Sequence, residues 1–269
     1  MKTTYRLTLL FGMLTVCGTS QAHKRWLLPS IFSVSEAQWV AVDASVSNNL
    51  FYVDRPWPLT SVSVTAPDGK PAKTDNLNEG HRRSSFDVYL DQPGTYRAST
   101  GGDVFFVQYS SVDGEVTRDR AFDLSSLKAS VPADATAVNY ARSVSRLETY
   151  MTLGAPDQKV FTPSGRGLEL KPVSHPNDLY VNEKVALQFL VEGKPAVGLE
   201  VLMVWEGTRY RDEEGAINLL TDDQGTITFT PDRTGRFLLE AGAEKVLTED
   251  PVFSTLYMTY IGTFEVLPQ

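Results

Sequence analysis

The sequence predicts a mainly β protein built from two β-sandwich, immunoglobulin-like domains with one helical insert. Three observations support this prediction. Apolar and polar residues alternate with a period of two in most segments, which is typical of strands with one buried face. Turns rich in Pro, Gly and Asp separate these segments at the spacing of a sandwich. The 269 residues are 42% apolar, which is enough for packed cores and excludes a wholly disordered chain.

The first sandwich is predicted over residues 23–165. Its strands are expected where the alternation is clearest, at residues 39–46, 59–65, 85–90, 95–99 and 104–109. Two tetrads, Ala-Pro-Asp-Gly and Asp-Gln-Pro-Gly, separate neighbouring strands. Pro fixes φ at the start of such a turn and Gly accepts a positive φ at its end.

A helix is predicted near residues 134–153. The apolar residues Val138, Ala141, Val144, Leu147 and Met151 recur every three or four positions, which is typical of one helix face. A Gly and a Pro follow within a few residues and would end the helix. We expect this face to pack against a sheet.

The second sandwich is predicted over residues 166–269, after a linker without periodicity at 158–167. Strand alternation resumes there and continues to the end of the chain. The expected strands are residues 168–171, 184–191, 199–205, 226–230, 237–240 and 257–267.

Residues 1–22 are predicted to be a secretory signal peptide rather than part of the fold. Lys2 and Arg6 precede an apolar run at residues 7–16, and the segment ends in Ser-Gln-Ala. An uncleaved anchor fits less well, because a spanning helix needs roughly 20 residues. A lipoprotein signal at Cys17 is disfavoured by the bulky residue before it. We therefore expect a periplasmic protein that begins at His23.

Removal of this segment takes away two of the 25 basic residues, leaving 23 against 33 acidic ones, and the single cysteine. The resulting net charge of −10 disfavours nucleic acid or an anionic membrane surface as the main partner. Without a thiol there is no disulfide and no thiolate metal ligand. Any bound metal would have to be held by nitrogen and oxygen atoms.

The usual catalytic motifs are absent from the sequence, and we expect a protein that is not an enzyme. The three histidines are the informative residues. His23, as the first residue of the processed chain, would offer its α-amine and ring Nδ1 to one cation. A second imidazole would complete a histidine brace, a geometry that suits Cu(II) or Ni(II). Both nitrogens lose their protons near neutral pH.

His175 is the expected second imidazole, because it lies in a Pro-stiffened loop at the start of the second sandwich. Asp43 is the expected acidic ligand. His81 is a weaker candidate, because the two arginines that follow it would repel a cation. The predicted metal ligands are therefore His23, His175 and Asp43.

Several ordered segments resemble a family of exported bacterial proteins with a domain of unknown function. They are residues 22–30, which begin Ala-His-Lys-Arg-Trp, and residues 42–51, 64–69, 172–179 and 207–212. The resemblance implies a periplasmic component linked to nickel or cobalt uptake. The resemblance implies a role for His23 in its Ala-His-x-x-Trp-Leu-x-Pro start and for His175 in its His-Pro-x-Asp loop. The family start is matched here by Ala-His-Lys-Arg-Trp-Leu-Leu-Pro.

The leading hypothesis is a periplasmic protein that binds a divalent transition metal, Ni, Co, Cu or iron, and passes it to a membrane or periplasmic uptake component. A copper oxidase or monooxygenase built on the same brace is an alternative from another class. A third hypothesis is a non-metal, immunoglobulin-like interaction module. A large separation of His23 from His175 would favour this third hypothesis.

Overall fold

The computed structural model describes residues 23–269, and the predicted signal peptide lies outside the described residues. More than half of the described residues lie in strands. The helical elements are α1 (Leu124–Ser130) and two short 3₁₀ turns, η1 (Lys159–Phe161) and η2 (Thr208–Tyr210). No helix in this part of the chain has the length and apolar character needed to cross a membrane.

The smaller sheet of the N-terminal half has five antiparallel strands. Its order is β1 (Lys24–Pro29), β3 (Gln38–Ser47), β7 (Ser84–Leu90) and β6 (Lys73–Glu79), with β4 (Arg55–Pro56) on β3. Buried and half-buried residues alternate regularly along β7. One face of this sheet therefore meets a core.

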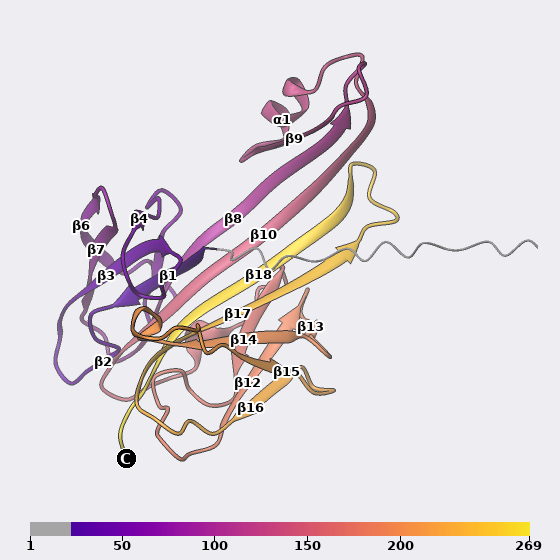
Figure 1. Ribbon diagram of the computed structural model, residues 1–269. Coiled ribbons are helices and arrows are strands. Elements are labelled where there is room, and N and C mark those ends of the chain that lie inside the picture. The colour runs from indigo at the N-terminus through magenta and orange to yellow at the C-terminus, as the bar shows by residue number, and fades with distance from the viewer. Residues whose placement is uncertain (1–22) are drawn as a thin grey trace, which may run out of the picture.

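A second sheet has nine strands and runs through the whole molecule (Figure 1). The N-terminal and C-terminal strands of this sheet meet where the two long strands β10 and β18 pair in parallel. The order is β15 (Ile217–Leu220), β14 (Glu200–Trp205), β17 (Gly235–Val246), β18 (Phe253–Val266), β10 (Thr136–Leu153), β8 (Gly94–Ser110) and β5 (Ser63–Thr65), with β2 (Ser33–Val34) on β10 and β9 (Val116–Ala121) on β8.

The third sheet is small and packs on the part of the nine-stranded sheet that β14, β17 and β18 form. Its strands are β11 (Leu168–Pro172), β12 (Val185–Val191), β13 (Lys194–Pro195) and β16 (Thr226–Phe229). Apolar residues of β12 and β18, including Phe189 and Phe264, share one buried core between these sheets.

Two sandwiches result, because the five-stranded sheet packs on β8 and β10 while the third sheet packs near β17 and β18. Val42, Phe86 and Met151 belong to the first core. A further buried cluster around Trp26 and Leu147 joins the two halves. The mainly β class with two immunoglobulin-like sandwiches is thus confirmed. The predicted division of the chain at residues 165 and 166 stays a prediction.

The predicted helix at residues 134–153 is wrong, because this segment is the long strand β10. Both faces of β10 are covered over its second half, so apolar residues occupy both faces. Leu147 belongs to the cluster that joins the halves, whereas Tyr150 belongs to the C-terminal core. A strand buried on both faces loses the simple period of two. The true helix, α1, is short and is capped by Asp123, whose Oδ1 accepts a hydrogen bond from the Ser126 amide at 2.8 Å.

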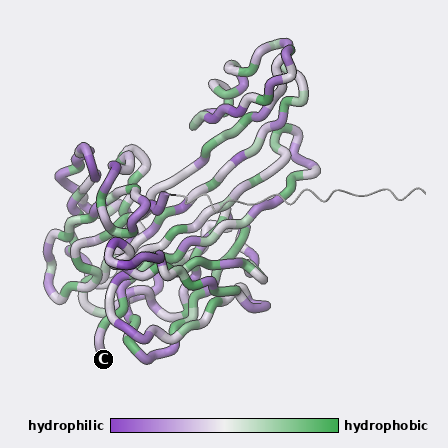
Figure 2. Tube along the Cα trace, in the orientation of Figure 1, coloured by the Kyte–Doolittle hydropathy of each residue, from purple (hydrophilic) through white to green (hydrophobic). Residues whose placement is uncertain are grey.

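Beyond the sandwiches, the nine-stranded sheet continues as an arm (Figure 1). We define the arm as residues 102–143 and 242–257, which contain the outer parts of β8, β10, β17 and β18 together with β9 and α1. Hydrophilic and hydrophobic residues are interspersed along it (Figure 2). Exposed residues of the arm include the apolar Val112 and Val138 and the polar Gln108 and Arg118, so its surface is mixed.

Candidate functional site

His23 lies just before β1 and is exposed to solvent. Its ring Nδ1 is 2.6 Å from the side-chain oxygen of Asn48. The ring is therefore accessible at the start of the described chain, beside the loop that follows β3.

His175 is buried and makes hydrogen bonds with both ring nitrogens. Its Nδ1 accepts a hydrogen bond from the Asn177 amide at 3.1 Å. Its Nε2 lies 2.9 Å from the Thr95 hydroxyl and 3.0 Å from the Asp157 carbonyl oxygen. Because that carbonyl can only accept, Nε2 carries the proton and the ring is neutral. Burial lowers the pKa of His175 below its ordinary value, in agreement with this assignment.

Asp43 lies on β3 and forms an ion pair with Arg83 at 3.0 Å. Burial raises the pKa of Asp43, while the charge and hydrogen bond of Arg83 act in the opposite direction. Its charge is thus already matched by a neighbouring cation.

The three predicted ligands are not brought together. Asn177, whose amide bonds the His175 ring, donates from its side chain to the Phe32 carbonyl oxygen after β1, whereas His23 lies at the other end of β1. The six residues of β1 correspond to roughly 20 Å of extended chain. Within residues 23–269, no three His, Asp, Glu or Cys side chains are grouped as metal ligands.

Two of the segments that carry the family resemblance do meet in space. Thr208 of η2 is buried, and its hydroxyl accepts a hydrogen bond from the Leu50 amide at 3.0 Å. Next to this contact, the Arg209 guanidinium stacks over the Tyr52 ring at 4.2 Å. Residues 158 positions apart therefore form one seam between the sandwiches, on the side of the molecule where His23 lies.

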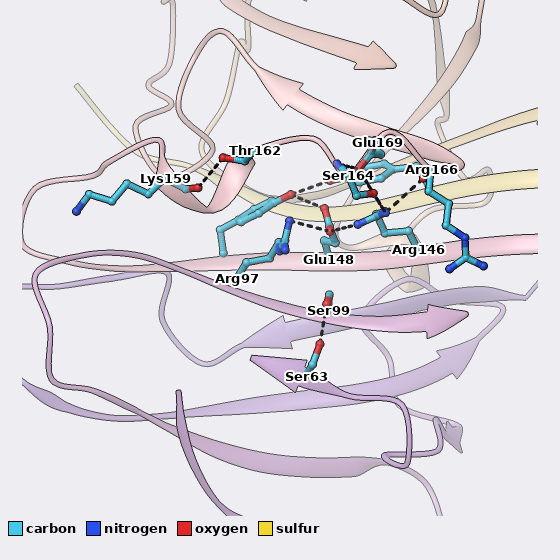
Figure 3. Close-up of polar contacts among 12 residues, drawn as sticks. Ser63, Arg97, Ser99, Arg146, Glu148, Lys159, Thr162, Ser164, Arg166 and Glu169 are labelled. Carbon is cyan, nitrogen blue, oxygen red and sulfur yellow. Dashed lines mark hydrogen bonds and ion pairs between the residues drawn. The ribbon is translucent and has the colours of Figure 1, made fainter. Parts of the chain in front are cut away.

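A buried charged network crosses the nine-stranded sheet (Figure 3). The Glu148 side chain on β10 is only 3% exposed, and it lies 3.8 Å from Arg97 and 3.3 Å from Arg146. The Tyr150 hydroxyl donates a hydrogen bond to Glu148 at 2.6 Å. Burial and the Glu148 charge raise the pKa of Tyr150 well above its ordinary value, so this hydroxyl stays protonated.

Glu169 extends the network to the segment that connects the sandwiches. It accepts hydrogen bonds from the amides of Ser164 and Gly165 and lies 3.4 Å from Arg146. Burial opposes ionisation of Glu169, but these hydrogen bonds and the Arg146 charge leave its pKa lowered. Two carboxylates thus face two guanidinium groups. This arrangement fixes the connecting segment against the sheet and leaves neither carboxylate free to act as a general base.

A hollow of about 230 Å³ lies on one face of the arm. Its lining combines two aromatic rings with amide, guanidinium, carboxylate and hydroxyl groups. These residues are Phe106, Val107, Gln108, Arg118, Asp119, Asn139, Ala141, Ser254, Thr255 and Tyr257. The strand register places Phe106 opposite Ala141 and Tyr257 beside Ser143. Because side chains two residues apart share a face, these aromatic rings lie on the same face of the sheet.

Irregular pairing of β10 accompanies the hollow. The register with β8 shifts between Thr136 and Asn139, and the register with β18 shifts between Tyr140 and Ala141. Ala137 has a φ of 51°, which is unusual for a residue with a side chain. Bulges of this kind are frequent near binding sites, where they re-aim side chains.

The sequence did not predict the hollow, because residues 134–153 were predicted as a helix, whereas they form strand β10, over which the hollow lies. Residues 104–109 are a strand as expected, but they are continuous with the strand expected at residues 95–99, and both belong to β8. Its successive aromatic residues, Phe105 and Phe106, were the signal that could have pointed to apolar groups on both faces. The register shifts of β10 have no equivalent signal in the sequence.

Among solved structures, the chain is similar to several bacterial and phage β proteins. The D0-D1 domain of intimin is 13% identical, with a TM-score of 0.23, over 87% of this chain and 96% of that one. The Escherichia coli adhesin FdeC is 14% identical, with a TM-score of 0.22, over 89% and 65%. Trypsin-activated α-2-macroglobulin from Escherichia coli is 11% identical, with a TM-score of 0.21, over 90% and 23%. Likeness at this level gives no information about ligands or partners.

No curated protein matches the chain in sequence. A family model matches residues 20–245, which is most of the chain. The description of that family names neither a metal nor a transport role, so the link to nickel or cobalt uptake stays a prediction. The chain belongs to the family described as a domain of unknown function, DUF4198.

Proposed function

We propose that the chain is an exported, non-enzymatic binding module whose binding surface is one face of the arm. The observation that supports this proposal is the extension of the nine-stranded sheet past both cores. Sheets in soluble proteins usually cover their apolar faces, yet Tyr257 on the arm is 42% exposed. An exposed mixed surface on a rigid sheet is typical of a binding site.

Only one face of the arm is open. Val107 and Asp119 border the hollow, but strand alternation directs their side chains to the opposite face from Phe106. Val107 is buried there, and α1 packs against β8 and β9. The Ser130 hydroxyl at the end of α1 donates a hydrogen bond at 3.0 Å to Asp119, which is opposite Val107 in the strand register. The face that carries Phe106 and Tyr257 has no such cover among the described residues.

Site-specific photo-crosslinking in the native host tests this proposal. A benzoylphenylalanine would replace Tyr257 on the arm, and a matched variant would carry it at Trp39, an exposed aromatic on the outer face of the five-stranded sheet. We expect an adduct from position 257 and none from position 39. Equal adducts at both positions, or none at position 257, would contradict the proposal.

Metal binding at the processed N-terminus is a second candidate, now confined to His23. The exposed position of His23 favours it, and metal binding would have to displace the contact between His23 Nδ1 and the Asn48 side-chain oxygen. His175 does not fit a metal, because both of its ring nitrogens are hydrogen-bonded within the buried interior. Titration of residues 23–269 with Ni(II) and Cu(II) tests it. Binding that is lost in His23→Ala but retained in His175→Gln would support this candidate. Absence of binding would remove it, and with it the oxidase built on the same residue.

A further inference from the structure

We infer that the hollow on the arm binds a short oligosaccharide through one or two of its sugar rings. This inference rests on the proposed function and names the chemistry of the ligand. It depends on the lining of the hollow, its position within the sheet and the groups that remain available there.

The lining matches both aspects of a sugar ring. A pyranose has an apolar face of C–H groups and a rim of hydroxyls that donate and accept hydrogen bonds. Phe106 and Tyr257 offer aromatic surfaces for the first aspect. Gln108 and Asn139 offer amide groups, which both donate and accept, for the second. Ligand sites commonly combine apolar walls with a few oriented polar groups in this way.

Arg118 is held so that most of its donors remain free. Its Nε donates a hydrogen bond to the Gln108 side-chain oxygen at 2.8 Å. This contact orients both side chains and leaves the terminal guanidinium nitrogens facing solvent, where Arg118 is exposed. Arg118 forms no ion pair with any residue that the structure describes. A guanidinium with two free donors binds a carboxylate in a bidentate manner, so a ring that carries a carboxylate is the favoured ligand.

A polypeptide ligand fits the hollow less well. The hollow lies over β10, which is paired on both sides by β8 and β18. An added strand needs a free sheet edge with unpaired backbone groups, and β10 provides none along its paired length. An apolar side chain inserted here would leave the amide and guanidinium groups without partners, which is costly once they lose water.

Binding to defined sugars tests the inference. The processed chain, residues 23–269, would be screened on a glycan array and then titrated calorimetrically with maltotriose, N,N′-diacetylchitobiose and digalacturonic acid. We expect binding of at least one of these probes, with digalacturonic acid the tightest. Tyr257→Ala should weaken binding by about tenfold, whereas Trp39→Ala should leave it unchanged. Arg118→Gln should weaken the binding of digalacturonic acid and leave the binding of the neutral sugars unchanged.

A second variant distinguishes loss of the binding site from loss of the folded state. Ala141→Trp would fill the hollow from its floor and should also abolish binding, with its folded state checked by circular dichroism. Absence of sugar binding, or binding that survives both Tyr257→Ala and Ala141→Trp, would overturn the inference. If the photo-crosslinked adduct at position 257 contains a polypeptide, the inference that the ligand is a sugar is wrong, but the proposal that the arm is a binding surface is supported. Absence of any adduct would overturn the binding module itself.

Discussion

At His175, both ring nitrogens are hydrogen-bonded inside the protein, and burial lowers the pKa of the ring below 6.5. The folded state therefore resists protonation more strongly than the unfolded state. The resulting contribution to stability is complete above pH 6.5 and is lost as the pH falls through that value towards the folded pKa.

We expect His175→Gln to reduce the pH dependence of stability. The free energy of unfolding should fall by about 1–3 kcal/mol at pH 8, because buried partners lose a hydrogen bond. Between pH 7.5 and pH 5 the variant should then lose less stability than the parent. Urea denaturation at these pH values measures both effects. An identical pH dependence in the two proteins would contradict the assignment of a neutral, buried ring.

Glu148 provides a second prediction for a single residue. Glu148→Gln would leave Arg97 without its buried countercharge and Arg146 with Glu169 alone, so we expect a loss of about 3–5 kcal/mol in the free energy of unfolding. Asp54→Asn is the matched control, because Asp54 pairs with Arg82 where both side chains are about half exposed. That change should cost less than about 1 kcal/mol. Similar losses in the two variants would show that burial of the network does not matter.

Among the elements, strands with one covered face were predictable, and β10 was not. The alternation in residues 85–90 corresponds to β7, where buried and half-exposed positions alternate throughout. In β10 the two faces meet different cores, so Leu147 and Tyr150 are both buried. A single sequence does not reveal that a second core lies behind a strand, and the apolar spacing then resembles that of a helix.

The neighbouring glycines of β8 test how closely β8 approaches β10. Both Gly101 and Gly102 have positive φ, 129° and 136°. A Cβ on Gly101 would collide with the Ser145 carbonyl oxygen, whereas a Cβ on Gly102 meets nothing nearby. We therefore expect Gly101→Ala to destabilise the protein by at least about 2 kcal/mol more than Gly102→Ala, as measured by thermal or urea unfolding. Equal effects would contradict this close approach.

On the scale of the whole molecule, one sheet joins two sandwiches. The parallel pairing of β10 with β18 and the buried cluster around Trp26 both cross the joint. Neither half can separate without exposing this cluster. The molecule should therefore behave as a single unit on unfolding, and its arm should be held rigidly relative to both cores.

Calorimetry of residues 23–269 should accordingly show one cooperative transition. Trp26→Ala should lower its midpoint without splitting it, with a cost of about 3–5 kcal/mol for the lost core contacts. Two separate transitions in the parent protein would show that the sandwiches are independent domains.

The candidate site was less predictable than the fold class. His23, His175 and Asp43 were selected by residue type and position in the sequence, but their separation depends on the direction of β1 and on the course of the loop at Phe32. The hollow on the arm depends on two register shifts of β10. Register is set by packing and turn geometry across distant strands, so the sequence pattern of any one strand does not specify it.

Hydroxyl-radical footprinting in the intact cell envelope tests the central claim, that the open face of the arm is the binding surface. Oxidation rates of exposed side chains would be compared between cells and the purified chain. We expect Tyr257 and Phe106 to be protected in cells, while Trp39 and Tyr210, exposed elsewhere on the molecule, should be oxidised at the same rate in both samples. Equal oxidation of Tyr257 in cells and in the purified chain would contradict it.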